Sequence, residues 1–193
     1  MSGRDRHSIP LPSLSRPLHA DDTPVCCRRA STPGVLCGHR CCKSMNRVAK
    51  NGAYKYDDGT KYIGDWNSRG MKHGAGLLVL PDGTRYNGTL QNGLCSGLGV
   101  IIFPDGAKYE GEFMQGWFHG HGVFWRADGM KFEGEFRGGR VWGSGLVTYA
   151  DGSHGFPRNE GFFQDCRLVR RRRCLDIVQK AQKISMMART QCS

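Results

Sequence analysis

A five-residue pattern that recurs at a nearly constant interval constrains the fold of this chain more than any other feature. In four of its five copies an aromatic residue stands two positions before a central glycine, and the residue two positions after the glycine is usually aromatic as well. The central glycines are Gly64, Gly88, Gly111, Gly134 and Gly161, which lie 24, 23, 23 and 27 residues apart. A fixed period in this range is typical of a repeat array, in which each unit buries its apolar face only against its neighbours.

The residues around one central glycine predict a β-hairpin. Residues 100–103 are apolar and mostly β-branched, which favours an extended strand. Residues 104–106 read Pro-Asp-Gly, a strong turn signal. In residues 108–113 the aromatic residues and the glycine alternate with charged residues, as in a strand with one apolar face, and Gln115-Gly116 turns the chain again. We therefore expect an all-β fold: an elongated, single-layer antiparallel meander of hairpins.

The aromatic residues of the pattern are predicted to share one face of this sheet. A single layer has no second sheet to cover such a face, and large apolar strips are usually covered by a partner or by another segment of the chain. We therefore expect a concave groove that binds an extended or helical peptide. The alternative is that the rings pack on one another as the core of the array. The rings are Tyr62, Trp66, Tyr86, Tyr109, Phe113, Phe132 and Phe136.

Acidic residues flank the same glycines and are predicted to leave the sheet on the face opposite the rings, or at its rim. One interpretation is that they bind lysine or arginine side chains of a partner. The other is a solvated face with weak exposed pairs, such as Lys108 with Glu110, each contributing roughly 0–1 kcal/mol. The acidic residues are Asp65, Glu110, Glu112, Glu133 and Glu135.

Together with the Gly-x-Gly segments between the copies, often preceded by histidine as in His73-Gly74, this pattern resembles the MORN (membrane occupation and recognition nexus) repeat. The resemblance covers Gly52 to about Phe163. It implies a non-enzymatic adaptor without a cofactor, whose groove holds the tail of a class III unconventional myosin in actin-rich cell projections such as filopodium tips or stereocilia. Leu90 stands where an aromatic is usual, and Asn159 replaces tyrosine in the last copy, which we expect to act as an end cap.

The charge distribution argues against a nucleic-acid partner for the repeats. The chain has a formal net charge of +11, which alone would favour nucleic acid or a membrane. Residues 51–158, however, carry 11 basic and 11 acidic side chains, whereas residues 1–50 carry 9 and 3 and residues 159–193 carry 8 and 3. The excess therefore lies in the two tails. We divide the chain into an N-terminal extension (1–44), the repeat array (45–166) and a basic C-terminal helix and tail (167–193).

The N-terminal extension is rich in proline and serine and lacks any helical or strand period, which predicts disorder. Its clustered cysteines leave three interpretations open: a zinc site, reversible acylation, or unstructured thiols. No apolar run has the length of a signal peptide or a membrane span, so we expect a cytoplasmic protein. The cysteines are Cys26, Cys27, Cys37, Cys41 and Cys42.

Residues 168–188 are predicted to form a helix, because apolar residues recur there at spacings of three and four. In the first interpretation this helix caps the array or folds back on it and closes an open β edge. In the second, the stripe and Arg170–Arg173 contact an anionic membrane surface, which makes a phospholipid-binding module the alternative function. The stripe consists of Cys174, Ile177, Val178, Ala181, Ile184 and Ala188.

Catalysis is not expected. His73 and His119 occupy the same position in their repeats, and a catalytic group is not usually needed once per repeat. The chain has no nucleophile elbow, no phosphate-binding loop and no zinc-protease motif. The Gly-x-Gly segments are repeat glycines rather than a dinucleotide loop, because no helical pattern follows them. Neither a catalytic residue nor a metal ligand is therefore assigned.

Overall fold

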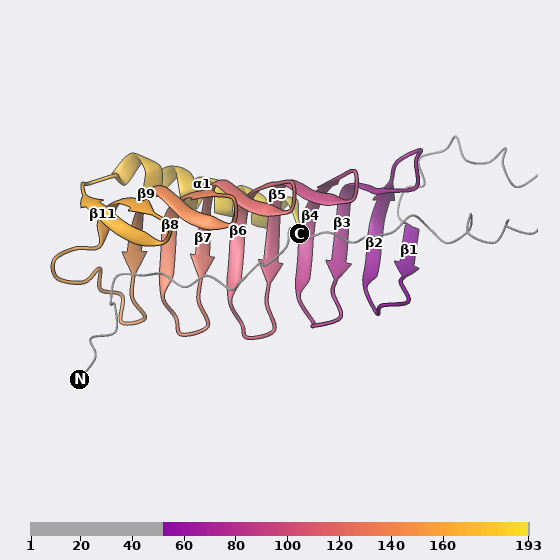
Figure 1. Ribbon diagram of the computed structural model, residues 1–193, viewed down its shortest axis with the longest axis horizontal. Helices are drawn as coiled ribbons and strands as arrows, with labels where there is room; N and C mark the ends of the chain where they lie inside the picture. The colour runs from indigo at the N-terminus through magenta and orange to yellow at the C-terminus, as the bar shows by residue number, and fades with distance from the viewer. Residues whose placement is uncertain (1–51, 193) are drawn as a thin grey trace, which may run out of the picture.

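The computed structural model describes residues 52–192, which form one 11-stranded antiparallel sheet and one helix (Figure 1). Each strand pairs with the next in sequence, so the predicted single-layer meander is confirmed. The strands are β1 Gly52–Lys55, β2 Lys61–Trp66, β3 Lys72–Val79, β4 Arg85–Gln91, β5 Leu94–Ile102, β6 Lys108–Met114, β7 Trp117–Trp125, β8 Lys131–Arg137, β9 Arg140–Thr148, β10 Glu160–Gln164 and β11 Arg167–Arg171. The helix α1 spans Leu175–Gln191. The N-terminal extension and its cysteines lie outside the described residues.

The turns form as their sequences predict. In the Asp-Gly turn between β5 and β6, the N–H of Phe103 donates to the carbonyl of Ala107 at 2.8 Å, and the Asp105 carboxylate accepts the N–H of Ala107 at 2.9 Å. At the other end of the hairpins, Gln115 and Gly116 have φ angles of 50° and 83°. Two consecutive positive φ angles define the two-residue turn that best matches the twist of paired strands.

The first ring of a copy leans over the central glycine. The Tyr109 hydroxyl donates to the carbonyl of Glu112 at 2.9 Å, so the ring lies along its own strand. A Cβ atom built on Gly111 or Gly122 would lie within 2.7 Å of this ring. Only glycine therefore leaves room for the ring, and Tyr62 and Tyr86 make the equivalent hydrogen bond in their copies.

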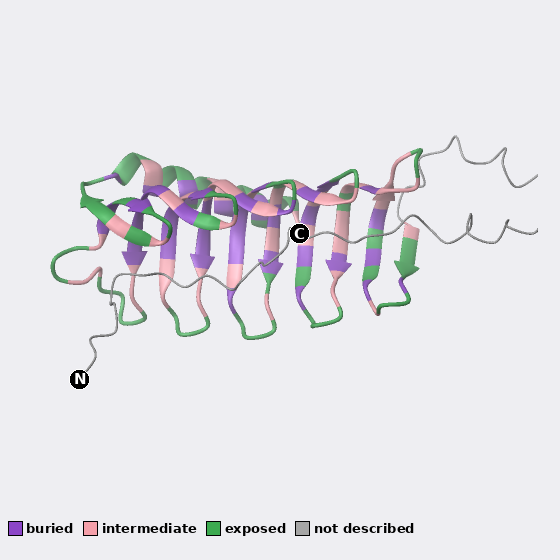
Figure 2. Cartoon of the chain, in the orientation of Figure 1, coloured by how far each residue is buried: buried purple, intermediate pink, exposed green. Residues whose placement is uncertain are grey.

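The aromatic face is a closed core, which corrects the prediction of an open aromatic groove. Six of the seven rings are at most 4% exposed, and Trp66 is partly buried. The rings cover one another, mostly edge to face, and Tyr109 stacks on Phe118 with centroids 4.1 Å apart. Residues beside the turns, including Leu80 and Phe103, pack against the same cluster. Figure 2 shows buried residues along the strands and exposed ones gathered in the turns. This is the alternative in which the rings form the core of the array.

The C-terminal segment differs from the prediction in its first residues. Arg167–Arg171 forms β11, which pairs with β10, so the array extends beyond residue 166 and the last copy is a complete hairpin. A two-residue turn at Asp165 and Cys166, both with positive φ, reverses the chain there. The helix begins only at Leu175. It contacts β5 to β9 and so lies across the sheet rather than along its edge. Within residues 52–192, no further strand pairs with β11.

Candidate interaction site

The face opposite the rings carries a row of residues, one from each strand from β2 to β10. Strand register places these residues side by side, and the row crosses the sheet along the long axis of the array. We call it the central row. It consists of Ile63, Leu77, Asn87, Val100, Glu110, Val123, Glu133, Leu146 and Glu160. The row alternates between aliphatic residues of the odd-numbered strands and more variable residues of the even-numbered strands.

Helix α1 covers the C-terminal part of the central row. Its buried residues are small: Val178, Ala181, Ser185 and Ala188. Leu146, Cys174 and Val178 form a second apolar cluster, separate from the aromatic core. The apolar stripe of the helix therefore faces the sheet, which confirms that the helix folds back on the array. The same stripe is not turned outward, as a membrane-surface helix would require. No helix within residues 52–192 combines the length and the apolar character needed to cross a bilayer.

Polar residues of the central row hold α1 at regular intervals. Glu160 accepts the N–H of Cys174 at 2.8 Å, Glu133 accepts a hydrogen bond from Gln182 at 2.8 Å, and Glu110 bonds Ser185 at 2.5 Å and Arg189 at 2.9 Å. At the end of the helix, the Asn87 amide donates to the carbonyl of Cys192 at 2.8 Å. These anchors are the same position of four successive copies.

The spacing of the anchors across the sheet matches the length of the helix, because the helix runs along the repeat axis. Each repeat contributes two strands and advances roughly 9.6 Å, so three repeats advance roughly 29 Å. The residues from Cys174 to Cys192 rise roughly 27 Å in a helix. The helix is therefore long enough to reach from the Glu160 copy to the Asn87 copy and no further.

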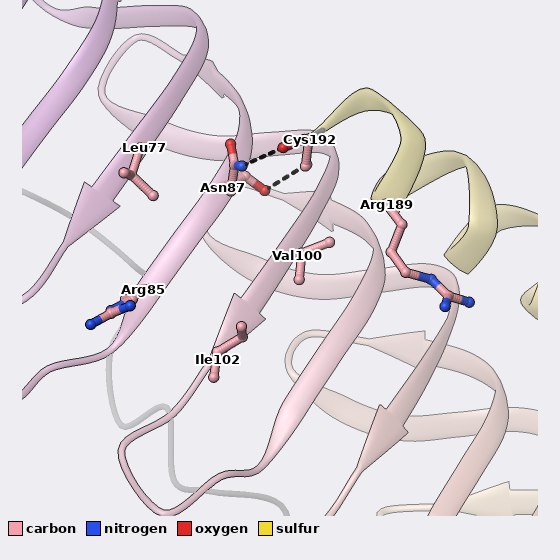
Figure 3. Close-up of a pocket in the computed structure, with 7 residues that line it drawn as sticks. All are labelled: Leu77, Arg85, Asn87, Val100, Ile102, Arg189 and Cys192. Carbon is pink, nitrogen blue, oxygen red and sulfur yellow. Dashed lines mark hydrogen bonds between the residues drawn. The ribbon is translucent and has the colours of Figure 1, made fainter.

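Beyond the end of α1, no other segment of residues 52–192 lies over the central row. Under the helix, Val123 is 2% and Leu146 is 6% exposed, whereas Leu77 and Val100 are half-buried and Ile63 is 51% exposed. A pocket of about 350 Å³ opens there (Figure 3). We call this surface the open trough. It is formed by the pocket residues Leu77, Arg85, Asn87, Val100, Ile102, Arg189 and Cys192, together with Lys61 and Ile63.

The predicted acidic residues are engaged inside the protein. Glu110 and Glu133 are buried beneath α1, and the Lys108–Glu110 pair, 2.7 Å long, is not the exposed pair expected from the sequence. Glu112 and Glu135 accept the backbone N–H groups of His121 and Ser144 at 2.5 and 2.6 Å, which holds the irregular pairing beside the Gly-x-Gly segments. Asp65 lies over Gly74, where a built Cβ would be 2.8 Å from its carboxylate.

The electrostatics of Glu160 follow from its contacts. Its burial favours the neutral acid, but the N–H of Cys174 and the guanidinium of Arg158 hold the pKa of this carboxyl below its ordinary value. The carboxylate is therefore charged at neutral pH, and it accepts the N–H of Cys174, the residue immediately before the helix. Carboxylates at a helix N-terminus are also favoured by the helix dipole.

The predicted glycines differ in their surroundings. At Gly64, Gly88, Gly111 and Gly134, a Cβ would lie 2.6–2.7 Å from the Cα of the glycine opposite in the next strand. At Gly161, a Cβ would lie 2.0 Å from the carbonyl oxygen of Arg170, and its φ of 154° also favours glycine. All five positions thus need glycine for close strand approach.

The histidines do not form a catalytic arrangement in the described residues. His121 lies between Glu112 and Glu135, with nitrogen–oxygen distances of 3.4 and 3.9 Å, and the Nδ1 of His119 is buried without a hydrogen-bond partner. His154 contacts Thr148 and the carbonyl of Val147. Within residues 52–192, no group of three metal-ligating side chains is assembled.

Sequence reasoning missed the residues of the open trough. It followed the aromatic face and treated the opposite face only through its acidic residues. The missed residues include Leu77 of β3 and Val100 and Ile102 of β5, whose hairpins also carry the aromatic rings. The available signal was strand alternation, which places these aliphatic residues on the face that carries Glu110 in the next strand.

A single-layer array of β-hairpins, with a glycine-spaced aromatic core and one face that α1 covers in part, places the chain in the class of repeat proteins whose units pack against their neighbours. A family model for the MORN repeat matches residues 62–85, 86–108, 109–131 and 132–154. The chain is also 70% identical over 145 residues to the MORN repeat-containing protein 4 homolog of Drosophila melanogaster, an alignment that spans 75% of this chain and 73% of that protein. The chain belongs to the MORN-repeat family, which is generally a non-enzymatic family of interaction adaptors.

A solved structure gives a weaker likeness. It is the TCP domain of SAS-4 from Drosophila melanogaster, in complex with a proline-rich motif of Ana2. The identity is 12%, the TM-score is 0.20, and the likeness covers 59% of this chain and 89% of that one. A TM-score this low carries no argument about the interaction site.

Proposed function

We propose that the protein is an adaptor that binds a helical or extended segment of a partner in the open trough, and that this partner is the tail of a class III myosin in actin-rich cell projections. The observation that most supports this proposal is that the side chains of the central row become more exposed toward the N-terminal end of the array. The same row is covered by α1 at Val123 and Leu146 and is exposed at Ile63, with Leu77 and Val100 between. A partner segment placed there would continue the path that α1 follows over the other half of the array.

The partner is thus assigned to the face opposite the aromatic rings. The rings have almost no surface left to bury, so they contribute to binding only by holding the strands in place. The open trough instead offers aliphatic side chains, a pocket and three basic side chains, of which Arg189 pairs with Glu110. Apolar anchors in a pocket at the centre of an interface usually supply most of the binding energy.

The choice of the myosin tail as the partner rests on the family resemblance. Binding of this tail to the open trough is tested by isothermal titration calorimetry. The full chain is titrated with a class III myosin tail fragment, and the measurement is repeated with Val100→Asp. We expect the affinity to fall at least about tenfold, because a carboxylate is placed against an apolar interface. The matched control is Val169→Asp, which introduces the same group at a 61%-exposed position of β11, outside the open trough.

Three outcomes decide the proposal. A loss of affinity in Val100→Asp alone supports it, provided that thermal unfolding shows both variants to be folded. Equal affinity in Val100→Asp and the original chain would place the tail elsewhere and overturn the assignment of the site. A tail fragment that binds none of the folded proteins would overturn the choice of partner.

A further inference from the structure

A second row of residues, beside the central row, carries one basic side chain in every repeat. The residue immediately before the first ring position is basic in all five copies. Strand register places Lys61, Arg85, Lys108 and Lys131 in one line on the face that carries α1. The five residues are Lys61, Arg85, Lys108, Lys131 and Arg158. We call this line the basic row.

The basic row is neutralised only where α1 covers the sheet. Lys108 pairs with Glu110 at 2.7 Å, Lys131 pairs with Glu133 at 3.1 Å, and Arg158 pairs with Glu160. In each of these copies the carboxylate belongs to the central row, two residues after the cation. The same three carboxylates also hold α1.

In the first two copies the central row has no carboxylate. Ile63 and Asn87 stand there instead. Within residues 52–192, neither Lys61 nor Arg85 forms an ion pair, and both side chains are exposed. Arg85 lines the pocket of the open trough beside Ile102 (Figure 3). The open half of the face is thus apolar, and its two cations of the basic row have no acidic partner among the described residues. In the covered half, each cation of the basic row pairs with a carboxylate of the central row.

Helix α1 shows what an occupant of this face needs. Toward Glu133 and Glu110 it presents Gln182, Ser185 and Arg189, which are donors and a cation. A segment bound in the open trough would instead face the basic side chains of Lys61 and Arg85. We propose that the open trough selects an amphipathic helix with an aliphatic stripe and carboxylates that face Arg85 and Lys61. This deepens the proposed function and rests on it, because it specifies the chemistry of the segment that binds the same surface.

The repeat length sets the spacing of those carboxylates. One repeat advances roughly 9.6 Å along the array, and a helix rises 1.5 Å per residue, so Arg85 and Lys61 match helix positions about six to seven residues apart. Positions seven apart lie on one side of a helix. A second copy of α1 does not fit this requirement, because residues 175–191 contain three basic residues and only one acidic residue.

The test is a selection of displayed helical peptides on the immobilised full chain. The library randomises apolar, acidic, basic and neutral polar residues on a helix-forming background. Peptides are kept when their binding is lost on Val100→Asp, so that only ligands of the open trough are analysed. Their affinities are then measured on the double variant Lys61→Glu/Arg85→Glu. The matched control is Arg69→Glu/Arg137→Glu, which changes the net charge equally at exposed positions outside the open trough.

We expect the kept peptides to be enriched in carboxylates six or seven residues apart. Their affinity should fall at least about tenfold on the Lys61/Arg85 variant, and much less on the control. Added salt should also weaken their binding to the original chain. Kept peptides without acidic enrichment, or with equal affinity for the Lys61/Arg85 variant, would overturn this inference and leave the proposed function standing. If no peptide depends on Val100, both fail together.

Discussion

The fit of the Tyr109 ring over two glycines gives the sharpest prediction for the core. In Gly122→Ala, the new Cβ would lie 2.6 Å from the Tyr109 hydroxyl oxygen and 2.7 Å from two ring carbons. The backbone at Gly122 is not in the left-handed region, and the three atoms nearest to the new Cβ all belong to Tyr109. The ring is fully buried, so it cannot move aside without disturbing Phe118 and losing its hydrogen bond to Glu112.

The magnitude follows from three contributions. Overpacking of a buried site costs roughly 1–3 kcal/mol. Loss of the Tyr109 hydroxyl bond costs roughly 1 kcal/mol. The lower entropy of alanine in the unfolded chain returns roughly 0.4–1 kcal/mol. We therefore expect Gly122→Ala to lower the free energy of unfolding by about 1–3.5 kcal/mol, measured by urea denaturation.

A double-mutant cycle separates the ring clash from other effects. In a Tyr109→Ala background the ring is absent, so adding Gly122→Ala should cost less than about 0.5 kcal/mol. The coupling between the two substitutions would then account for most of the single-variant effect. Equal costs of Gly122→Ala with and without the ring would refute the reasoning, because the clash would not be its cause.

Three further predictions concern the helix and the thiols. Glu110→Ala removes the acceptor of Ser185 and Arg189, so hydrogen exchange should speed up in the last two turns of α1 while the central strands stay protected. Because the folded-state pKa of Glu160 is lowered, its charged carboxylate stabilises the fold above the ordinary glutamate pKa, and this stabilisation is lost as the pH falls through the lowered value. The unfolding temperatures of Glu160→Gln and the original chain should therefore become equal in acid. Burial raises the pKa of the Cys95 thiol, so alkylation followed by mass spectrometry should label it at neutral pH only after denaturant is added.

The array could be predicted from the sequence because its signals are local. The Asp-Gly turns, the alternation in residues 108–113 and the period of the central glycines all act within one hairpin. The lean of the rings over glycine could be predicted for the same reason, since Tyr109 bonds a carbonyl three residues away. The start of α1 could not, because the expected helix began at residue 168, and Leu168 instead lies in β11, where pairing with β10 decides its conformation.

The candidate site depends on which repeats lie beneath α1. The sequence of a single repeat does not show whether α1 covers it. Sequence alternation shows that Glu110 and Tyr109 lie on opposite faces, but not that α1 returns across the face of Glu110. The rings gave the larger apolar signal and therefore drew the prediction to a face that is closed in the structure. A folded repeat array needs an apolar core somewhere, so a strong aromatic period indicates that core before it indicates a binding surface.

Helix length thus determines how much of the array stays open. From Cys174 to Cys192 the anchors cover three repeats in 18 residues, or six residues per repeat on average, close to the value expected from the roughly 9.6 Å repeat and the 1.5 Å helical rise. Because α1 ends at Gln191, it covers the copies that carry Glu133 and Glu110 and stops at Asn87. The copy at which it stops and the copy beyond it, with Asn87 and Ile63, are also those in which the acid of the central row is missing. The extent of the helix and the change in charge therefore mark the same boundary, at Asn87, between the covered half of the face and the half that we assign to the partner.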